Sequence, residues 1–189
     1  MAGSSDTMIK QDILRTYSLM EGNRATKVIA CLLAPGVQAV IVFRFGQWLL
    51  RQPFLVRVFL TPWYLLGVHR IRKRWGIVLR RETPIGEGLY IAHEGLIRIS
   101  GGARVGKNLS ISHDVTIGIS GKGDKYGCPT IGDNVYIAPG ARLFGKIKVG
   151  SNVKIGANCV VHKDIPDNAI VVLSPGFSII SHEGNVESR

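Results

Sequence analysis

The stretch "IGDNVYIAPGARLFGKIKVGSNVKIGANCVV", residues 131–161, carries an aliphatic residue at every sixth position. These positions are Ile131, Ile137, Leu143, Val149, Ile155 and Val161. A sustained period of six is typical of parallel β-helices, in which each unit supplies one short strand and one turn. Three units complete a triangular coil, and the aliphatic side chains stack inside the prism. The repeat therefore predicts a mainly β chain folded as a parallel β-helix.

The same period extends toward the N-terminus with two interruptions. The earlier aliphatic positions are Ile85, Ile91, Ile97, Val105, Ile111 and Ile117. We expect a two-residue insertion between Ile97 and Val105, and an eight-residue insertion before Ile131. The second insertion lies in "ISGKGDKYGCPT" (119–130), a Gly-rich loop that leaves the prism and is long enough to suggest a function. We assign residues 76–166 to the prism and 167–189 to a C-terminal tail.

The coil arithmetic places two histidines in one column. With three units per coil, the same face begins at Ile91, Ile111, Ile137 and Ile155. Two residues after each of these come His93, His113, Pro139 and Ala157, which should stack at a strand spacing of about 4.8 Å. A lone histidine on a strand is usually structural. Two stacked histidines beside the one long loop favour a functional site.

The N-terminal segment, residues 1–75, has a different pattern. Apolar residues spaced three and four apart predict helices over 8–75, interrupted by prolines. Residues 1–83 hold 13 Lys and Arg against 4 Asp and Glu, so most of the net charge of +11 lies there. Residues 22–81 contain 11 basic residues and no acidic residue.

Two interpretations of residues 22–81 remain open. Aromatic and aliphatic side chains beside unopposed positive charge suit an anionic membrane surface, where each basic residue contributes about 1 kcal/mol. Alternatively, the apolar faces pack on one another and on neighbouring subunits, with the arginines on a solvated face. No nucleic-acid partner is expected, because no recognition motif accompanies the charge. The uncharged run 28–43 is shorter than the ~20 residues that span a bilayer.

Cysteine usage and the N-terminus predict a location. Cys31, Cys128 and Cys159 have unrelated spacings, which form neither a disulfide framework nor a paired zinc motif. No signal peptide is visible. We expect a cytoplasmic protein, or one bound peripherally to the inner face of the membrane.

From about Trp75 to Ile180 the chain resembles the serine O-acetyltransferase branch of the hexapeptide acyltransferases. The family pattern F-G-I-D-I-H-P-x-A-x-I-G lies over "WGIVLRRETPIG" (75–86), L-D-H over "IAH" (91–93), and I-G-A-G-S-V-V over "IGANCVV" (155–161). The resemblance implies a left-handed coil, acetyl-CoA as co-substrate without a metal, and a homotrimer with active sites between subunits. It places His93 on the catalytic histidine.

Several family positions differ in this chain. The aspartate that orients the catalytic histidine is Val78, and the aspartate that helps to hold serine is Ala92. The Gly-rich loop of the family ends in Arg-His, where this chain has Gly127 and Cys128. The "CP" at 128–129 and "ISHDVTIG" at 111–118 resemble the polysaccharide O-acetyltransferases of the colanic-acid type.

These departures lead us to predict O-acetylation of a sugar hydroxyl in cell-surface polysaccharide biosynthesis (capsule, exopolysaccharide or lipopolysaccharide). The acceptor would be a small or lipid-linked saccharide. The alternative is serine O-acetyltransferase of cysteine biosynthesis. Further alternatives are a metal-dependent, carbonic anhydrase-like protein and a non-catalytic scaffold.

The predicted chemistry assigns roles to individual residues. His93 is the general base for the attacking hydroxyl, because imidazole titrates near neutral pH, and His113 is the second catalytic candidate. Glu94, Asp114 and Glu82 are the candidates to replace the orienting aspartate. The residues predicted to contact the donor are Gly118 (an oxyanion amide), Ala138, Gly156 and Ala157 (beside the pantetheine arm), and Lys122 and Lys163 (at the phosphates).

Overall fold

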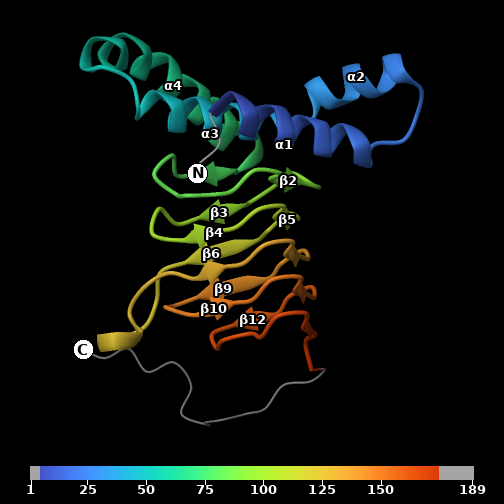
Figure 1. The fold of residues 1–189 in the computed structure, drawn as a ribbon, viewed down its shortest axis with the longest axis vertical. Helices are drawn as coiled ribbons and strands as arrows, with labels where there is room; N and C mark the ends of the chain where they lie inside the picture. The colour runs from blue at the N-terminus through green and yellow to red at the C-terminus, as the bar shows by residue number, and fades with distance from the viewer. Residues whose placement is uncertain (1–4, 175–189) are drawn as a thin grey trace.

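The computed structural model describes residues 5–174, which form a left-handed parallel β-helix with four helices at its N-terminal end (Figure 1). The helices are α1 (Ser5–Leu19), α2 (Arg24–Leu33), α3 (Pro35–Leu49) and α4 (Phe54–Trp75). The strands are β1 (Val78–Leu79), β2 (Tyr90–Ile91), β3 (Arg98–Ile99), β4 (Arg104–Val105), β5 (Ser110–Ile111), β6 (Thr116–Gly118), β7 (Thr130–Ile131), β8 (Tyr136–Ile137), β9 (Arg142–Phe144), β10 (Lys148–Val149), β11 (Lys154–Ile155), β12 (Val160–Val161) and β13 (Ile170–Val171). The predicted fold class is confirmed.

The strands form the three faces of a prism, and every pair of strands is parallel. Face A has the order β1-β3-β6-β9-β12, face B the order β4-β7-β10, and face C the order β2-β5-β8-β11-β13. Isolated bridges extend face B at both ends. One joins Ile85 to Val105, and the other joins Val149 to Ile165. Each coil therefore visits face B, face C and face A in turn.

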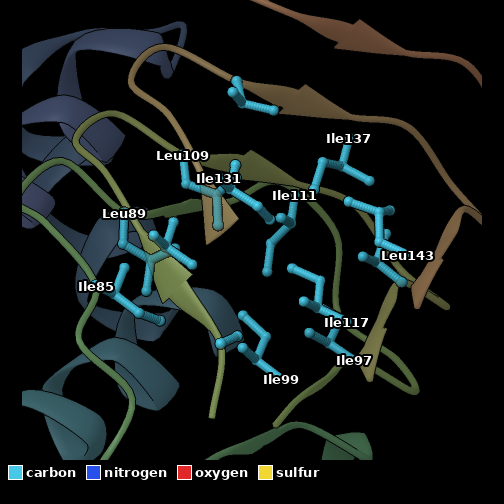
Figure 2. Packing of buried hydrophobic residues seen from close by; sticks show 14 of the residues in the cluster. Ile85, Leu89, Ile97, Ile99, Leu109, Ile111, Ile117, Ile131, Ile137 and Leu143 are labelled. Carbon is cyan, nitrogen blue, oxygen red and sulfur yellow. The ribbon is translucent and has the colours of Figure 1, made fainter. Parts of the chain in front are cut away.

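The core consists of the aliphatic positions of the repeat (Figure 2). Ile111, Ile117, Ile137 and Leu143 are fully buried. A second inward position lies two residues before each of them and is also apolar, as at Leu109. Burying a side chain of this size stabilises a fold by about 1.5–3 kcal/mol, so the stacked columns supply most of the driving force for coiling.

The two-residue insertion was wrongly placed. Ile99, rather than Ile97, pairs with Ile117 on face A, and Val105 follows six residues later. The extra residues therefore lie between Ile91 and Ile99, in the turn that carries His93. Ile97, just before β3, is fully buried at the second inward position of its unit, so its aliphatic character could not distinguish the two registers.

An asparagine ladder supports one corner of the prism. Asn108, Asn134, Asn152 and Asn168 have left-handed backbone conformations with φ between 57° and 61°. Each side-chain amide of the first three donates to the carbonyl oxygen of the next, at 2.9, 3.1 and 3.0 Å. Asparagine tolerates this conformation better than most residues with a Cβ. The ladder thus fixes the turn and links successive coils.

The prism continues beyond residue 166, because β13 pairs with β11. Residues 175–189 of the predicted tail lie outside the described residues.

A buried ion pair joins the helices to the first coil. The Arg44 Nε donates to Asp12 Oδ2 at 2.7 Å, and both side chains are almost completely buried. The guanidinium also donates to the carbonyl of Ile85 at 2.7 Å, while Asp12 Oδ1 accepts from the Leu89 amide at 2.7 Å. Polar groups at the open end of the β-helix are thereby satisfied. The expectation that the arginines form a solvated face is wrong for Arg44.

Other parts of the helices remain exposed. On α4, Phe54, Phe59 and Trp63 are 75, 73 and 69% exposed. In the part of the chain that the structure describes, no single helix has the length and composition to span a membrane. The pair α2 and α3 meets both criteria together, but it is bent by 60° between the two helices.

Candidate active site

The two histidines lie together on one edge of the prism. Ile91 and Ile111 are in register on face C, so His93 and His113 occupy the same position in successive coils, as predicted. Their ring centroids are 6.0 Å apart, and the planes meet at 70° in an edge-to-face arrangement. Both side chains are exposed. Either imidazole can therefore reach a substrate at this edge.

The candidates for an orienting carboxylate do not contact the histidines. Asp114 instead forms an ion pair with Arg142 at 3.1 Å, and Glu82 lies 3.4 Å from Arg81 Nε. Glu94 is exposed. Within residues 5–174, no carboxylate lies within ion-pair distance of His93 or His113. The two histidine rings contact each other.

Small residues border the histidine column. Ala138 is buried and Ala157 is exposed, in the coils beyond His113. A Cβ at Gly156 would lie 2.9 Å from the carbonyl oxygen of Val171. Close packing of the last coil therefore explains this glycine without a ligand.

A cleft of about 520 Å³, which we call the arginine cleft, opens on face A beside the helices. Arg72 from the last turn of α4, Arg80 after β1 and Arg98 in β3 line it. Gly118 lies in its wall, where a Cβ would be only 2.7 Å from the Phe144 ring. A larger side chain here would force the Phe144 ring to move, so packing against Phe144 favours glycine at this position, whatever its amide does.

A second cleft of about 380 Å³, the lysine cleft, lies farther along the prism and shares Phe144 with the first. Its lining includes Lys125 on the loop, Lys146, Lys163 and Asp164. The predicted donor residue Lys163 therefore lies in a cleft, whereas Lys122 lines neither of the two.

Two of the family positions that differ in this chain, Val78 and Cys128, lie at or beside the arginine cleft. Val78 lines the cleft and is the register partner of Arg98 on face A. Cys128 donates from Sγ to Ser100 Oγ at 3.3 Å, and Ser100 lines the same cleft. The end of the loop at Cys128 therefore contacts the coil that carries Arg98, through Ser100, which lies 28 residues earlier in the sequence.

The sequence reasoning missed the three arginines of this cleft and Lys125 and Lys146 of the other. The period of six contained part of the signal, because Arg98 lies one position before an inward isoleucine and must point outward. Arg72 belongs to a helix, and its approach to face A depends on how α4 packs. Among the described residues, no group of three or more His, Cys, Asp or Glu side chains could hold a metal ion.

Comparison with known proteins identifies relatives for both regions of the chain. Residues 128–163 match the family described as "Bacterial transferase hexapeptide (six repeats)". The chain is 35% identical to the serine acetyltransferase of Synechococcus elongatus over 150 residues, which are 79% of this chain and 58% of that protein. This chain spans less than two thirds of the length of the curated relatives that it matches first.

Solved serine acetyltransferases have the same fold. The soybean apoenzyme aligns with a TM-score of 0.72 and 30% identity, covering 91% of this chain and 69% of that one. The Brucella abortus enzyme in complex with coenzyme A aligns with a TM-score of 0.71 and 27% identity, covering 90% of this chain and 65% of that one.

These comparisons contradict the prediction of polysaccharide O-acetylation, which is wrong. These relatives and solved structures are serine acetyltransferases, the predicted alternative. They also give no support to a special closeness to the colanic-acid type or to a lipid-linked saccharide acceptor. The short motifs at 111–118 and 128–129 misled the prediction, because the similarity over the whole prism points elsewhere.

Proposed function

Since this chain belongs to the bacterial hexapeptide transferases, we propose that it is an acetyl-CoA-dependent O-acetyltransferase of the serine acetyltransferase kind. The observation that carries the proposal is the exposed His93–His113 pair on one edge of a prism whose relatives are serine acetyltransferases. L-serine is the leading acceptor, because these relatives are named for it.

In the proposed reaction, a ring nitrogen of His93 accepts the proton of the acceptor hydroxyl. The hydroxyl oxygen then attacks the thioester carbonyl of acetyl-CoA and forms a tetrahedral intermediate. Collapse of the intermediate breaks the C–S bond, and the CoA sulfur takes the proton from the imidazolium. The products are the acetyl ester and CoA thiol, so no acyl-enzyme and no cysteine nucleophile are needed. General-base help of this kind is typically worth 10²–10⁴ in rate.

The lysine cleft supports acetyl-CoA as donor. Lys125, Lys146 and Lys163 bring three ammonium groups to one cleft, and the phosphates of CoA are anionic. The residues Gly118, Ala138, Gly156 and Ala157 remain predicted donor contacts, although packing alone accounts for Gly118 and Gly156.

We also propose a homotrimer, on the grounds that neither histidine lines either cleft of its own chain. Packing prisms side by side would bring the histidine edge of one subunit to the clefts of the next. The exposed apolar residues of α4 are then available for further subunit contacts. Binding of residues 22–81 to an anionic membrane stays a prediction.

A thiol-release assay with acetyl-CoA and L-serine tests the function. We expect CoA release by the wild-type protein, and a loss of about 10²–10⁴ in kcat for His93→Ala. His69→Ala is the control, because His69 is an exposed histidine on α4 that lines neither cleft. Unchanged CoA release by His93→Ala would reject His93 as the base and favour a different catalytic group. No release with any hydroxyl acceptor would favour the non-catalytic scaffold.

A further inference from the structure

The arginine cleft concentrates positive charge without a counter-charge. Arg72, Arg80 and Arg98 come from three separate elements and line one cleft. The other lining residues are apolar, small or hydroxyl-bearing, so no carboxylate faces the guanidiniums. Among residues 5–174, the ion pairs of the structure involve none of the three arginines. The lysine cleft differs, since it includes Asp164.

The replacement at Val78 explains part of this excess charge. Val78 and Arg98 are direct neighbours across face A, at the strand spacing of about 4.8 Å. An aspartate at position 78, as the family pattern has, would lie beside the Arg98 guanidinium and neutralise it. Valine leaves the guanidinium free. The charge must then be compensated by water, salt or a ligand.

The chemistry of the cleft suits one class of ligand. A guanidinium presents a planar fork of N–H donors that matches a carboxylate or a phosphate. Ser100 and Thr116 add hydroxyl donors to the same wall. Several donors from rigid strands, with a helix terminus contributing Arg72, can hold such a group in a fixed orientation.

We propose that the arginine cleft binds an anionic group, a carboxylate or phosphate, of the hydroxyl-bearing acceptor. That the ligand is the acceptor rests on the proposed acetyl transfer. That the cleft binds an anion does not. The donor phosphates have three lysines in the neighbouring cleft, so the arginines are not needed for them.

Binding measurements on the full-length protein test the site without relying on catalysis. Calorimetric titration compares two pairs of probes, L-lactate with L-lactamide and glycerol 3-phosphate with glycerol. Each pair differs in the anionic group and keeps a hydroxyl. At least one anion should bind about tenfold or more tightly than its neutral partner, since hydrogen bonds to charged groups are strong. The pair with the larger ratio identifies carboxylate or phosphate. Rising NaCl should reduce the ratio.

Matched variants connect the ratio to the cleft. Arg98→Gln and Arg80→Gln should each reduce the ratio to about one- to threefold, whereas Arg104→Gln should leave it unchanged. Arg104 lies one unit after Arg98, exposed on face B. In the thiol-release assay, the two cleft variants should raise KM for the anionic acceptor and leave KM for acetyl-CoA unchanged.

Two results would overturn the proposal. One is equal affinity for charged and neutral probes in the wild-type protein, and the other is an unchanged ratio in Arg98→Gln and Arg80→Gln. If an anion binds through the arginines but no acceptor is acetylated, the anion site stands and the proposed function fails.

Discussion

Removing the carboxylate of Asp12 should destabilise the protein more than any surface substitution, because it leaves the buried positive charge of Arg44 without its partner. Arg44 has no exposed side-chain surface, and Asp12 is 2% exposed. Asp12→Ala removes the 2.7 Å bond from Arg44 Nε and the acceptor of the Leu89 amide. Breaking one side of a buried ion pair costs about 3–5 kcal/mol, which includes leaving the partner unpaired. We expect a loss in this range.

Urea unfolding followed by circular dichroism measures this change. Protein concentration must be matched between variants, since association contributes to apparent stability. The double variant Asp12→Ala/Arg44→Met should regain part of the loss, because no unpaired charge stays buried. Glu87→Gln, which removes a partly exposed salt bridge to Lys107, is the control and should change the midpoint little.

A destabilisation below about 1 kcal/mol for Asp12→Ala would refute the reasoning, because that is the range of exposed ion pairs. A double variant that is less stable than Asp12→Ala by several kcal/mol would also contradict it. That result would mean that the bonds of Arg44 to the first coil, rather than the pairing of charges, hold the helices on the prism.

Three further predictions concern other parts of the chain. Asn134→Ala should lower the free energy of unfolding by about 1–2 kcal/mol, because alanine disfavours the left-handed conformation and breaks the ladder. Asn134→Gly also breaks the ladder but adopts this conformation without strain, so it should lower the free energy of unfolding by less. Equal losses in the two variants would assign the effect to the ladder alone. Burial raises the pKa of the Cys31 thiol, so iodoacetamide at pH 7–8 should modify Cys31 more slowly than it modifies the half-buried Cys128. Mass spectrometry of peptides measures the two rates. Faster modification of Cys31 would show that α2 opens. If residues 22–81 bind membranes, the full chain should float with anionic but not with neutral vesicles. The double variant Phe59→Ser/Trp63→Ser should reduce this flotation. No flotation with anionic vesicles would leave subunit contacts as the explanation of the exposed α4 surface.

The period of six was enough to predict the prism and the histidine column. An aliphatic residue at every sixth position can be buried throughout only if the chain turns after each unit, and this constraint is local. The positions of His93 and His113 follow from counting along that repeat. The place of the two-residue insertion did not follow, because Ile97 and Ile99 both point inward and either satisfies an aliphatic pattern.

Sequence motifs predicted the function less well than the fold. Val78, Ala92 and Cys128 are departures at single positions, and they indicate the enzyme group less well than the similarity of the whole prism does. Such departures indicate how a site has changed. They did not identify the group of enzymes to which the chain is most similar.

The sequence by itself determined a parallel β-helix of aliphatic columns and a histidine pair on one of its edges, because both depend on a repeat that is written along the chain. Only the tertiary structure decided that Arg44 is buried against Asp12 and that Arg72, Arg80 and Arg98 share one cleft. Those arrangements depend on how α1, α3 and α4 pack against the first coil. Charged residues far apart in sequence carry no periodic signal of such contacts, so their environment appears only when the chain is folded.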